Sequence, residues 1–363
     1  MAFRSEPDFQ HGQAQRTGVL LCNLGTPDAP TAAATRRYLA EFLSDPRVVE
    51  IPRAVWLPLL HGVILRTRPA KSAAKYQSVW LPEGSPLMVH SRKQATLLRG
   101  YLGERGHDVT VRLAMRYGQP SIASQMDELR ARGCTRVLVV PLYPQYSGTT
   151  TASVFDAVAA WAGDARHVPE LRFVNRFHDD DGYIRALTRV VHEHWQAHGR
   201  PDKLVMSFHG VPERTLRLGD PYHCECHKTA RLLAERLALK EGEWQIAFQS
   251  RFGRAKWVGP STQTVLHALG RAGTGRVDVV CPGFVSDCLE TLEEIAMEGL
   301  ADFKAAGGGE FHYIRCLNDH PAWMAALAEL VQTHLQGWST KGKPDAHALA
   351  ASREQARALG AKA

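Results

Sequence analysis

The sequence contains no stretch of about 18 consecutive apolar residues, the length that a membrane-spanning helix needs. Its first sixteen residues, MAFRSEPDFQHGQAQR, hold no apolar core of a signal peptide. Cysteines are few and unevenly spaced, at positions 22, 134, 224, 226, 281, 288 and 316, a pattern that does not indicate a disulfide framework. We therefore expect a soluble protein of a reducing compartment, the cytoplasm.

Runs of basic residues are also missing. Lysine and arginine number 44 against 37 acidic residues, but this excess is scattered, which argues against a nucleic-acid partner. The composition is otherwise that of a globular protein, with 44% hydrophobic and 22% charged residues, and it excludes a disordered chain, a collagen and a coiled coil. A length of 363 residues is enough for two domains.

Short apolar runs alternate with segments of helical periodicity. Continuous runs rich in valine and leucine predict strands buried on both faces, at residues 19–24, 136–140, 203–208 and 277–281. Helical spacing occurs at residues 121–132, 181–197, 228–239 and 289–300. This alternation predicts an α/β fold with doubly wound, Rossmann-like parallel sheets.

A weak internal repeat predicts two similar domains. Leu-Cys-Asn-Leu-Gly-Thr-Pro at residues 21–27 matches Met-Ser-Phe-His-Gly-Val-Pro at residues 206–212 in its glycine and proline. Val-Val-Pro-Leu-Tyr at residues 139–143 similarly matches Val-Cys-Pro-Gly-Phe at residues 280–284. Because ligands bind at the carboxyl ends of parallel strands, Leu24 and His209 would line opposite walls of one cleft.

Residues 42–76 differ from the rest of the chain. An apolar segment at residues 54–65 is followed by a basic cluster that includes Arg68 and Lys75. This pattern is typical of a pocket lip or a shallow membrane contact, and equally of a core helix with a solvated end.

Two segments carry the residue types of a reaction centre. Residues 204–222 read as a strand, then His209, then a tight glycine turn, and a lone histidine after a strand is more often a structural hydrogen bonder. Residues 279–294 lead into a helix on which Glu290, Glu294 and Glu298 share one face. Taken alone, that face is typical of a solvated acidic surface.

Together with four further segments, these two resemble the ferrochelatases of bacterial type, the enzymes that insert ferrous iron into a porphyrin in haem synthesis. The further segments are residues 84–86, 115–118, 141–147 and 249–260, and the resemblance extends from about residue 19 to residue 336. It implies two similar chelatase-like domains at residues 17–178 and 179–320, with the porphyrin in the cleft between them. A helix at about 321–336 would pack back on the first domain, and residues 337–363 would be a flexible basic tail.

The resemblance also implies the site residues. His209 and Glu290 would be catalytic and would bind the metal, and Asp287 and Glu294 would form a path for protons or metal. Substrate-binding positions would be Leu24, Arg68, Tyr76, Ser85, Arg116, Tyr117 and Trp257. Insertion needs a distorted ring, a dehydrated metal and an acceptor for two protons. A protonated imidazole cannot ligate a metal, so whether His209 is the ligand or the proton acceptor stays open.

Several alternatives remain open. The substrate would be protoporphyrin IX or the more acidic coproporphyrin, and the apolar lip favours protoporphyrin. Another tetrapyrrole chelatase is the enzymatic alternative, and a porphyrin or haem carrier is the non-enzymatic one. The lip would give peripheral contact with the inner membrane, whereas nothing in the sequence indicates an oligomeric state.

Metals other than the substrate iron are a separate question. No cofactor is expected, and in particular no iron–sulfur cluster, because no cysteine follows Cys316 and Gly148 stands where cluster-bearing animal relatives have cysteine. Cys288 occupies a position where relatives often have histidine. The His-Cys-Glu-Cys-His segment at residues 223–227 looks like a metal site, but its cysteines are closer together than zinc sites usually require.

Overall fold

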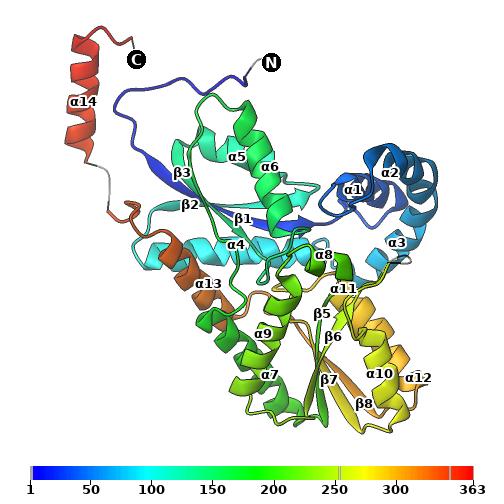
Figure 1. Ribbon diagram of the computed structural model, residues 1–363. Coiled ribbons are helices and arrows are strands. Elements are labelled where there is room, and N and C mark those ends of the chain that lie inside the picture. Colours follow the sequence, from blue (N-terminus) through cyan, green and yellow to red (C-terminus); the bar gives the residue numbers. More distant parts are fainter. Residues whose placement is uncertain (1–2, 252, 254, 343–344, 363) are drawn as a thin grey trace.

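A computed structural model describes residues 3–251, 253, 255–342 and 345–362 (Figure 1). Two residues of the 249–260 segment, and residues 343, 344 and 363 of the predicted tail, lie outside this description. No helix within the described residues is long and apolar enough to cross a membrane.

The described strands form two four-stranded parallel sheets. The first sheet has the order β2-β1-β3-β4, with β1 (Arg16–Gly25), β2 (Val109–Tyr117), β3 (Cys134–Pro141) and β4 (Glu170–Phe173). The second has the order β6-β5-β7-β8, with β5 (Lys203–His209), β6 (Trp244–Gln249), β7 (Arg276–Val280) and β8 (Glu310–Ile314). The orders are identical once the second is renumbered, so β5 is the counterpart of β1, as the repeat predicted.

Helices cover both faces of each sheet, which confirms the predicted α/β class. On the first sheet α4 (Pro86–Glu104) packs on one face, and α5 (Ile122–Ala131) and α6 (Thr151–Asp164) pack on the other. On the second sheet α7 (Asp181–His198) and α9 (Tyr222–Arg236) lie opposite α10 (Thr262–Arg271) and α12 (Leu300–Ala305). Strands enclosed in this way need apolar residues on both faces, and Val19 to Cys22 of β1 are all fully buried.

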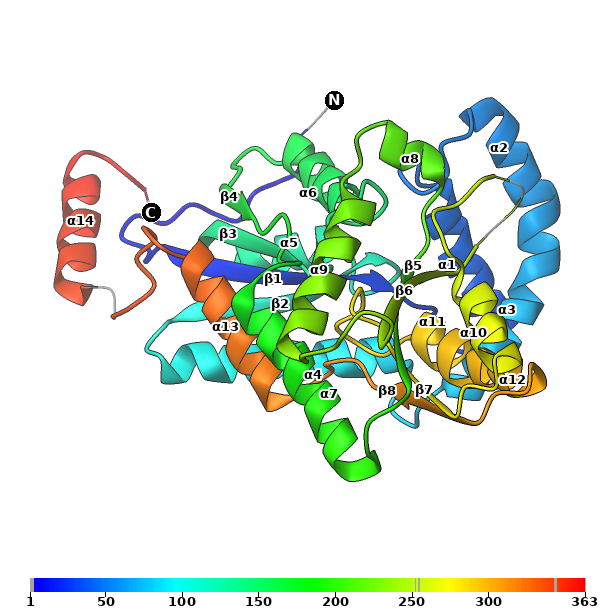
Figure 2. The same ribbon diagram turned by 60° about the horizontal axis from the view of Figure 1, so that its bottom comes forward.

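One helix joins the two halves. The helix α13 (Pro321–His334) packs against both α4 and α7, and a single buried apolar cluster runs through all three helices. Beyond it, α14 (Ala346–Ala358) has no buried residue and stands apart from the sheets in both views (Figures 1 and 2).

The lip predicted at residues 42–76 is a set of helices at the carboxyl end of β1 (Figure 1). It comprises the end of α1 (Ala32–Ser44), α2 (Arg53–Leu59), the π-helix η1 (Leu60–Ile64) and most of α3 (Leu65–Val79). The interpretation as a core helix is wrong for α2, which has no buried residue.

Two helix predictions need correction. The helix predicted from residue 228 begins six residues earlier, at Tyr222 of α9, shortly after the single turn α8 (Glu213–Arg217). The helix predicted at residues 289–300 is α11 (Leu289–Leu292) followed by a π-helix, η2 (Glu294–Gly299), and by α12. Because a π-helix has a wider turn, the four-residue spacing of its glutamates does not keep them on one face.

Candidate active site

His209 is the last residue of β5, and a backbone contact fixes its imidazole. Nδ1 lies 2.7 Å from the carbonyl oxygen of Gly210. A proton on Nδ1 donates to that oxygen, which puts the imidazole lone pair on Nε2. The ring is half-buried. The strand therefore ends in a nitrogen base of fixed tautomer at the edge of the sheet where ligands bind.

Gln249, the last residue of β6, ties this turn to the acidic segment. The Gly210 amide donates to the Gln249 carbonyl over 2.7 Å, and the Gln249 side-chain amide donates to the Glu290 carbonyl over 2.8 Å. Its side-chain oxygen accepts from the Ser207 hydroxyl at 2.7 Å. Gln249 is 3% exposed. One buried residue thus positions the backbone beside His209 through its main chain and the backbone of Glu290 through its side chain.

Glu290 lies in the first turn of α11, and two tyrosines from the lip helices are its electrostatic neighbours. Burial raises the pKa of Tyr76, on α3, and the charge of Glu290 raises it further. The pKa of Tyr38, on α1, is raised by burial, by Tyr76 and by Glu290. Both hydroxyls therefore stay neutral. The two tyrosines form an aromatic wall of the first domain beside the Glu290 carboxylate of the second domain.

Glu294, the first residue of η2, completes the ionisable cluster. Its carboxylate accepts from the Ser250 amide at 2.6 Å and also from the Ser250 hydroxyl. Burial raises the pKa of Glu294 and the charge of Glu290 adds to this, whereas Ser250 and His209 lower it. The three groups are thus electrically linked, and Glu294 holds a proton to a higher pH than an ordinary glutamate.

An imidazole with a fixed Nε2 lone pair and two carboxylates suits a divalent transition metal and can also accept protons. The ferrochelatase family model matches residues 16–335. The chain belongs to the ferrochelatase family. It is accordingly a metal chelatase, a lyase, as the sequence predicted.

Relatives named ferrochelatase resemble this chain over its whole length. One from Methylibium petroleiphilum is 66% identical and covers 100% of both chains, and one from a Polaromonas species is 64% identical and covers 99% of this chain and 100% of its own. A solved structure of SirB from Bacillus subtilis with Fe³⁺ has a TM-score of 0.55 at 12% identity, covering 91% of this chain and 100% of its own. That likeness supports the fold alone.

The structure places the other residues assigned by the resemblance in two groups. Trp257 is half-buried near the cluster and forms a backbone bridge with Pro212. Its ring lies against Gly210, because a Cβ added to Gly210 would be 3.2 Å from the ring of Trp257. Leu24 is half-buried at the carboxyl end of β1, and Arg68 is exposed on α3.

A second group is committed to internal hydrogen bonds. Arg116 and Tyr117 both donate to the Asp45 carboxylate, over 2.6 and 2.8 Å, and Tyr117 is fully buried. The Ser85 hydroxyl caps α4 by accepting from the Met88 amide.

Asp287 is likewise held in place. Its buried carboxylate accepts from the Tyr313 hydroxyl at 2.6 Å and from the Asn318 amide at 2.7 Å. In this structure it anchors the loop before α11, while Glu294 lies in the cluster.

Two site features escaped the sequence reasoning. Tyr38 sits four residues before Phe42 on α1, an aromatic spacing that signals a buried helix face but not that this face meets Glu290. Lys75 of α3 bridges Glu293 and Glu298 in the second domain, at 2.9 and 2.8 Å. This cation ties the lip to the π-helix that carries Glu294.

Proposed function

We propose that this ferrochelatase inserts ferrous iron into protoporphyrin IX at the cluster of His209, Glu290 and Glu294, giving protohaem and two protons, the terminal step of haem biosynthesis. The observation that carries the proposal is the double attachment through Gln249, which fixes the backbone of the base and of the acid relative to each other. Iron here is a substrate and not a resident cofactor.

The roles divide as follows. Glu290 serves as an anionic ligand to the incoming iron. The tyrosine hydroxyls beside it are neutral. His209 accepts a porphyrin proton at Nε2, because Nδ1 is engaged with the Gly210 carbonyl. Glu294, with its raised pKa, receives a proton from the centre and passes it outward. With this assignment, the His209 imidazole does not have to bind the metal and hold the porphyrin proton at the same time.

The walls would hold the macrocycle out of plane. Leu24 and Tyr76 from the first domain and Trp257 from the second provide apolar and aromatic surface for this purpose. Arg68, exposed on α3, would pair with a propionate carboxylate. Arg116 is less suited to that role, because its guanidinium already binds Asp45.

Anaerobic incubation with ferrous iron and each porphyrin tests the proposal, with loss of the free-base absorption spectrum as the readout. Glu290→Gln and His209→Ala should each lower the rate by about 10²–10⁴-fold, while Glu241→Gln, on an exposed turn, should leave it unchanged. A carrier would bind porphyrin with unchanged affinity in all four proteins and metallate none. Faster turnover of coproporphyrin than of protoporphyrin would overturn the choice of substrate.

The lip also supports peripheral contact with the cytoplasmic face of the inner membrane. Val55, Leu59 and Val63 of α2 and η1 are 64%, 44% and 52% exposed, with Arg66 and Arg68 close by in sequence. Apolar side chains flanked by basic ones are typical of interfacial binding to anionic lipid.

Sedimentation with anionic vesicles at low salt tests this contact. Replacing Val55 and Val63 by serine should reduce the bound fraction several-fold, whereas Val168→Ser, an exposed valine far along the chain, should not. Equal sedimentation of the two variants would exclude the lip as the contact. We further propose that no iron–sulfur cluster takes part, because Gly148 stands where cluster-bearing animal relatives have cysteine.

A further inference from the structure

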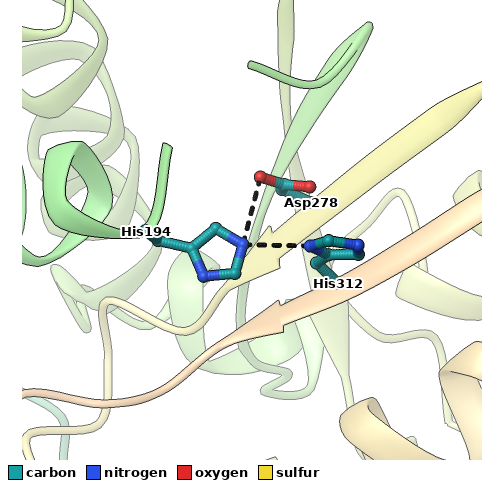
Figure 3. A group of neighbouring side chains, drawn as sticks. All are labelled: His194, Asp278 and His312. Atoms are coloured by element: carbon teal, nitrogen blue, oxygen red, sulfur yellow. Dashed lines mark hydrogen bonds and ion pairs between the residues drawn. The ribbon is translucent and has the colours of Figure 1, made fainter. Parts of the chain in front are cut away.

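A cluster of metal-binding side chains lies in the second domain outside the catalytic site. His312 of β8 and Asp278 of β7 are register partners on adjacent strands, and His194 of α7 points at both of them (Figure 3). His194 Nε2 is 3.2 Å from His312 Nδ1 and 3.6 Å from an Asp278 carboxylate oxygen. One atom from each residue lies within 4.8 Å of the other two.

This cluster is separate from the catalytic pair. Asp278 pairs in register with Leu204, five residues before His209 on β5. At about 3.3 Å per residue along a strand, the two sites are about 16 Å apart. The cluster lies level with the amino end of β5, whereas His209 lies at the carboxyl end of that strand.

We propose that His194, Asp278 and His312 form a second metal site, for a divalent first-row transition ion such as Zn²⁺. In a tetrahedral zinc site with bonds of about 2.0–2.1 Å, neighbouring ligand atoms are about 3.3–3.4 Å apart. The two distances from His194 Nε2, 3.2 and 3.6 Å, lie on either side of that value. Two imidazoles and one carboxylate leave a fourth position for water or a further ligand.

The surroundings hold the ligands ready. Asp278 is fully buried, and its carboxylate accepts from Arg276 at 2.8 and 3.0 Å and from the Trp195 indole at 2.9 Å. Donors of this kind orient a ligating carboxylate from behind.

A third histidine extends the site. His198 lies one turn after His194 on α7, with ring centroids 4.6 Å from His194 and 5.2 Å from His312. After a rotation of its side chain it would supply a third nitrogen, as the fourth ligand. Imidazole ligands select Zn²⁺, Fe²⁺, Co²⁺ or Ni²⁺ over Mg²⁺ and Ca²⁺, which prefer oxygen.

The exposed face of α9 offers a matched comparison. His223 and His227 have Nε2 atoms 3.2 Å apart, the same separation as in the proposed site. No third ligand joins them in any metal-binding group found among the described residues. Of the two cysteines between them, Cys226 is buried and Cys224 exposed, so they do not face one site.

Metal titration of the full chain tests the proposal, in a His209→Ala, Glu290→Gln background so that binding at the catalytic centre does not contribute. After chelator treatment, Zn²⁺ binding is measured by calorimetry and Co²⁺ binding by its visible d–d absorption. We expect one tight equivalent, lost in His194→Gln, His312→Gln and retained in His223→Gln, His227→Gln. Far-ultraviolet circular dichroism confirms that each variant is folded.

The outcomes separate the alternatives. An equal number of bound Zn²⁺ ions in the two histidine double variants would overturn the proposal. The absence of Zn²⁺ binding in the His209→Ala, Glu290→Gln background protein would also overturn it, and His194 and His312 would then be a hydrogen-bonded imidazole pair only. Restoring His209 and Glu290 in the His194→Gln, His312→Gln protein should return iron insertion to within about twofold of wild type. A hundredfold loss there would place these histidines in iron delivery and contradict a separate site.

Discussion

Gln249 provides the sharpest test of the catalytic geometry. The substitution Gln249→Met keeps the length and most of the volume of the side chain but removes its amide. It deletes the hydrogen bond to the Glu290 carbonyl and the acceptor for Ser207, while the main-chain bond to Gly210 remains. The Ser207 hydroxyl keeps Thr262 as a partner at 2.7 Å.

The expected energies follow from these contacts. Leaving one carbonyl group without its partner costs about 1–3 kcal/mol, and Ser207 contributes little because it is still bonded. We therefore expect a loss of about 2 kcal/mol in the free energy of unfolding. The larger effect is on catalysis, because a displacement of about 1 Å at a reacting group costs about 10²-fold in rate.

Steady-state insertion kinetics measure this effect. In Gln249→Met, kcat should fall by about 10²-fold while the porphyrin KM changes by less than about twofold, because the apolar walls are untouched. Gln263→Met, an exposed glutamine on α10, is the matched control and should behave as wild type. A Gln249→Met protein with wild-type kcat would show that the bond to the Glu290 backbone does not position the carboxylate.

Two further predictions concern stability. Asp45→Asn should cost about 3 kcal/mol near pH 7, because it removes the charge of the buried carboxylate that pairs with the half-buried Arg116 guanidinium. Burial raises the pKa of Asp45, but hydrogen bonds, first among them that from the Ser153 hydroxyl, outweigh burial and lower it. The difference between variant and wild type in urea unfolding should therefore shrink as the pH falls below about 4. Lys75→Met should cost at most about 1 kcal/mol, since Lys75 is half-exposed. Burial raises the pKa of its partner Glu293 and Lys75 lowers it, so removing Lys75 destabilises the protein more at pH 8, where Glu293 is ionised, than at pH 5. A greater loss of thermal stability at pH 5 would contradict this assignment.

The topology was predictable because it depends on local pattern. Apolar runs with few polar residues are typical of strands enclosed on both faces, and the repeated glycine turns at residues 25 and 210 mark where each central strand ends. The two sheets have these strands in the equivalent position. The position of His209 at the end of a strand was predictable for the same reason, since it immediately precedes one of those turns. Its catalytic role stays a prediction.

The commitments of polar side chains were not predictable. Arg116, Tyr117 and Asp287 have the residue types of a binding cleft, yet their partners, such as Asp45 and Asn318, come from segments remote in sequence. A short motif does not specify whether a buried carboxylate meets a substrate or another part of the chain. Helical periodicity likewise does not reveal the wider turn of the π-helix η2.

The two glycine turns explain how a repeated fold becomes an asymmetric site. An added Cβ at Gly25 would lie 1.9 Å from the Tyr117 carbonyl at the end of β2, and one at Gly210 would lie 2.8 Å from the Gln249 carbonyl at the end of β6. In both domains the central strand can therefore end against its neighbour only with glycine at this position.

The residue before each glycine is free of that constraint. It is Leu24 in the first domain and His209 in the second. The same glycine turn therefore presents an apolar side chain from the first sheet and an ionisable side chain from the second. Exchanging the two side chains, with histidine at position 24 and leucine at position 209, would leave both turns intact. It would move the base to the domain that lacks Glu290. In the proposed mechanism, the acid–base function depends on the second copy of the turn, because its neighbour Gln249 also binds the backbone of the segment that carries Glu290.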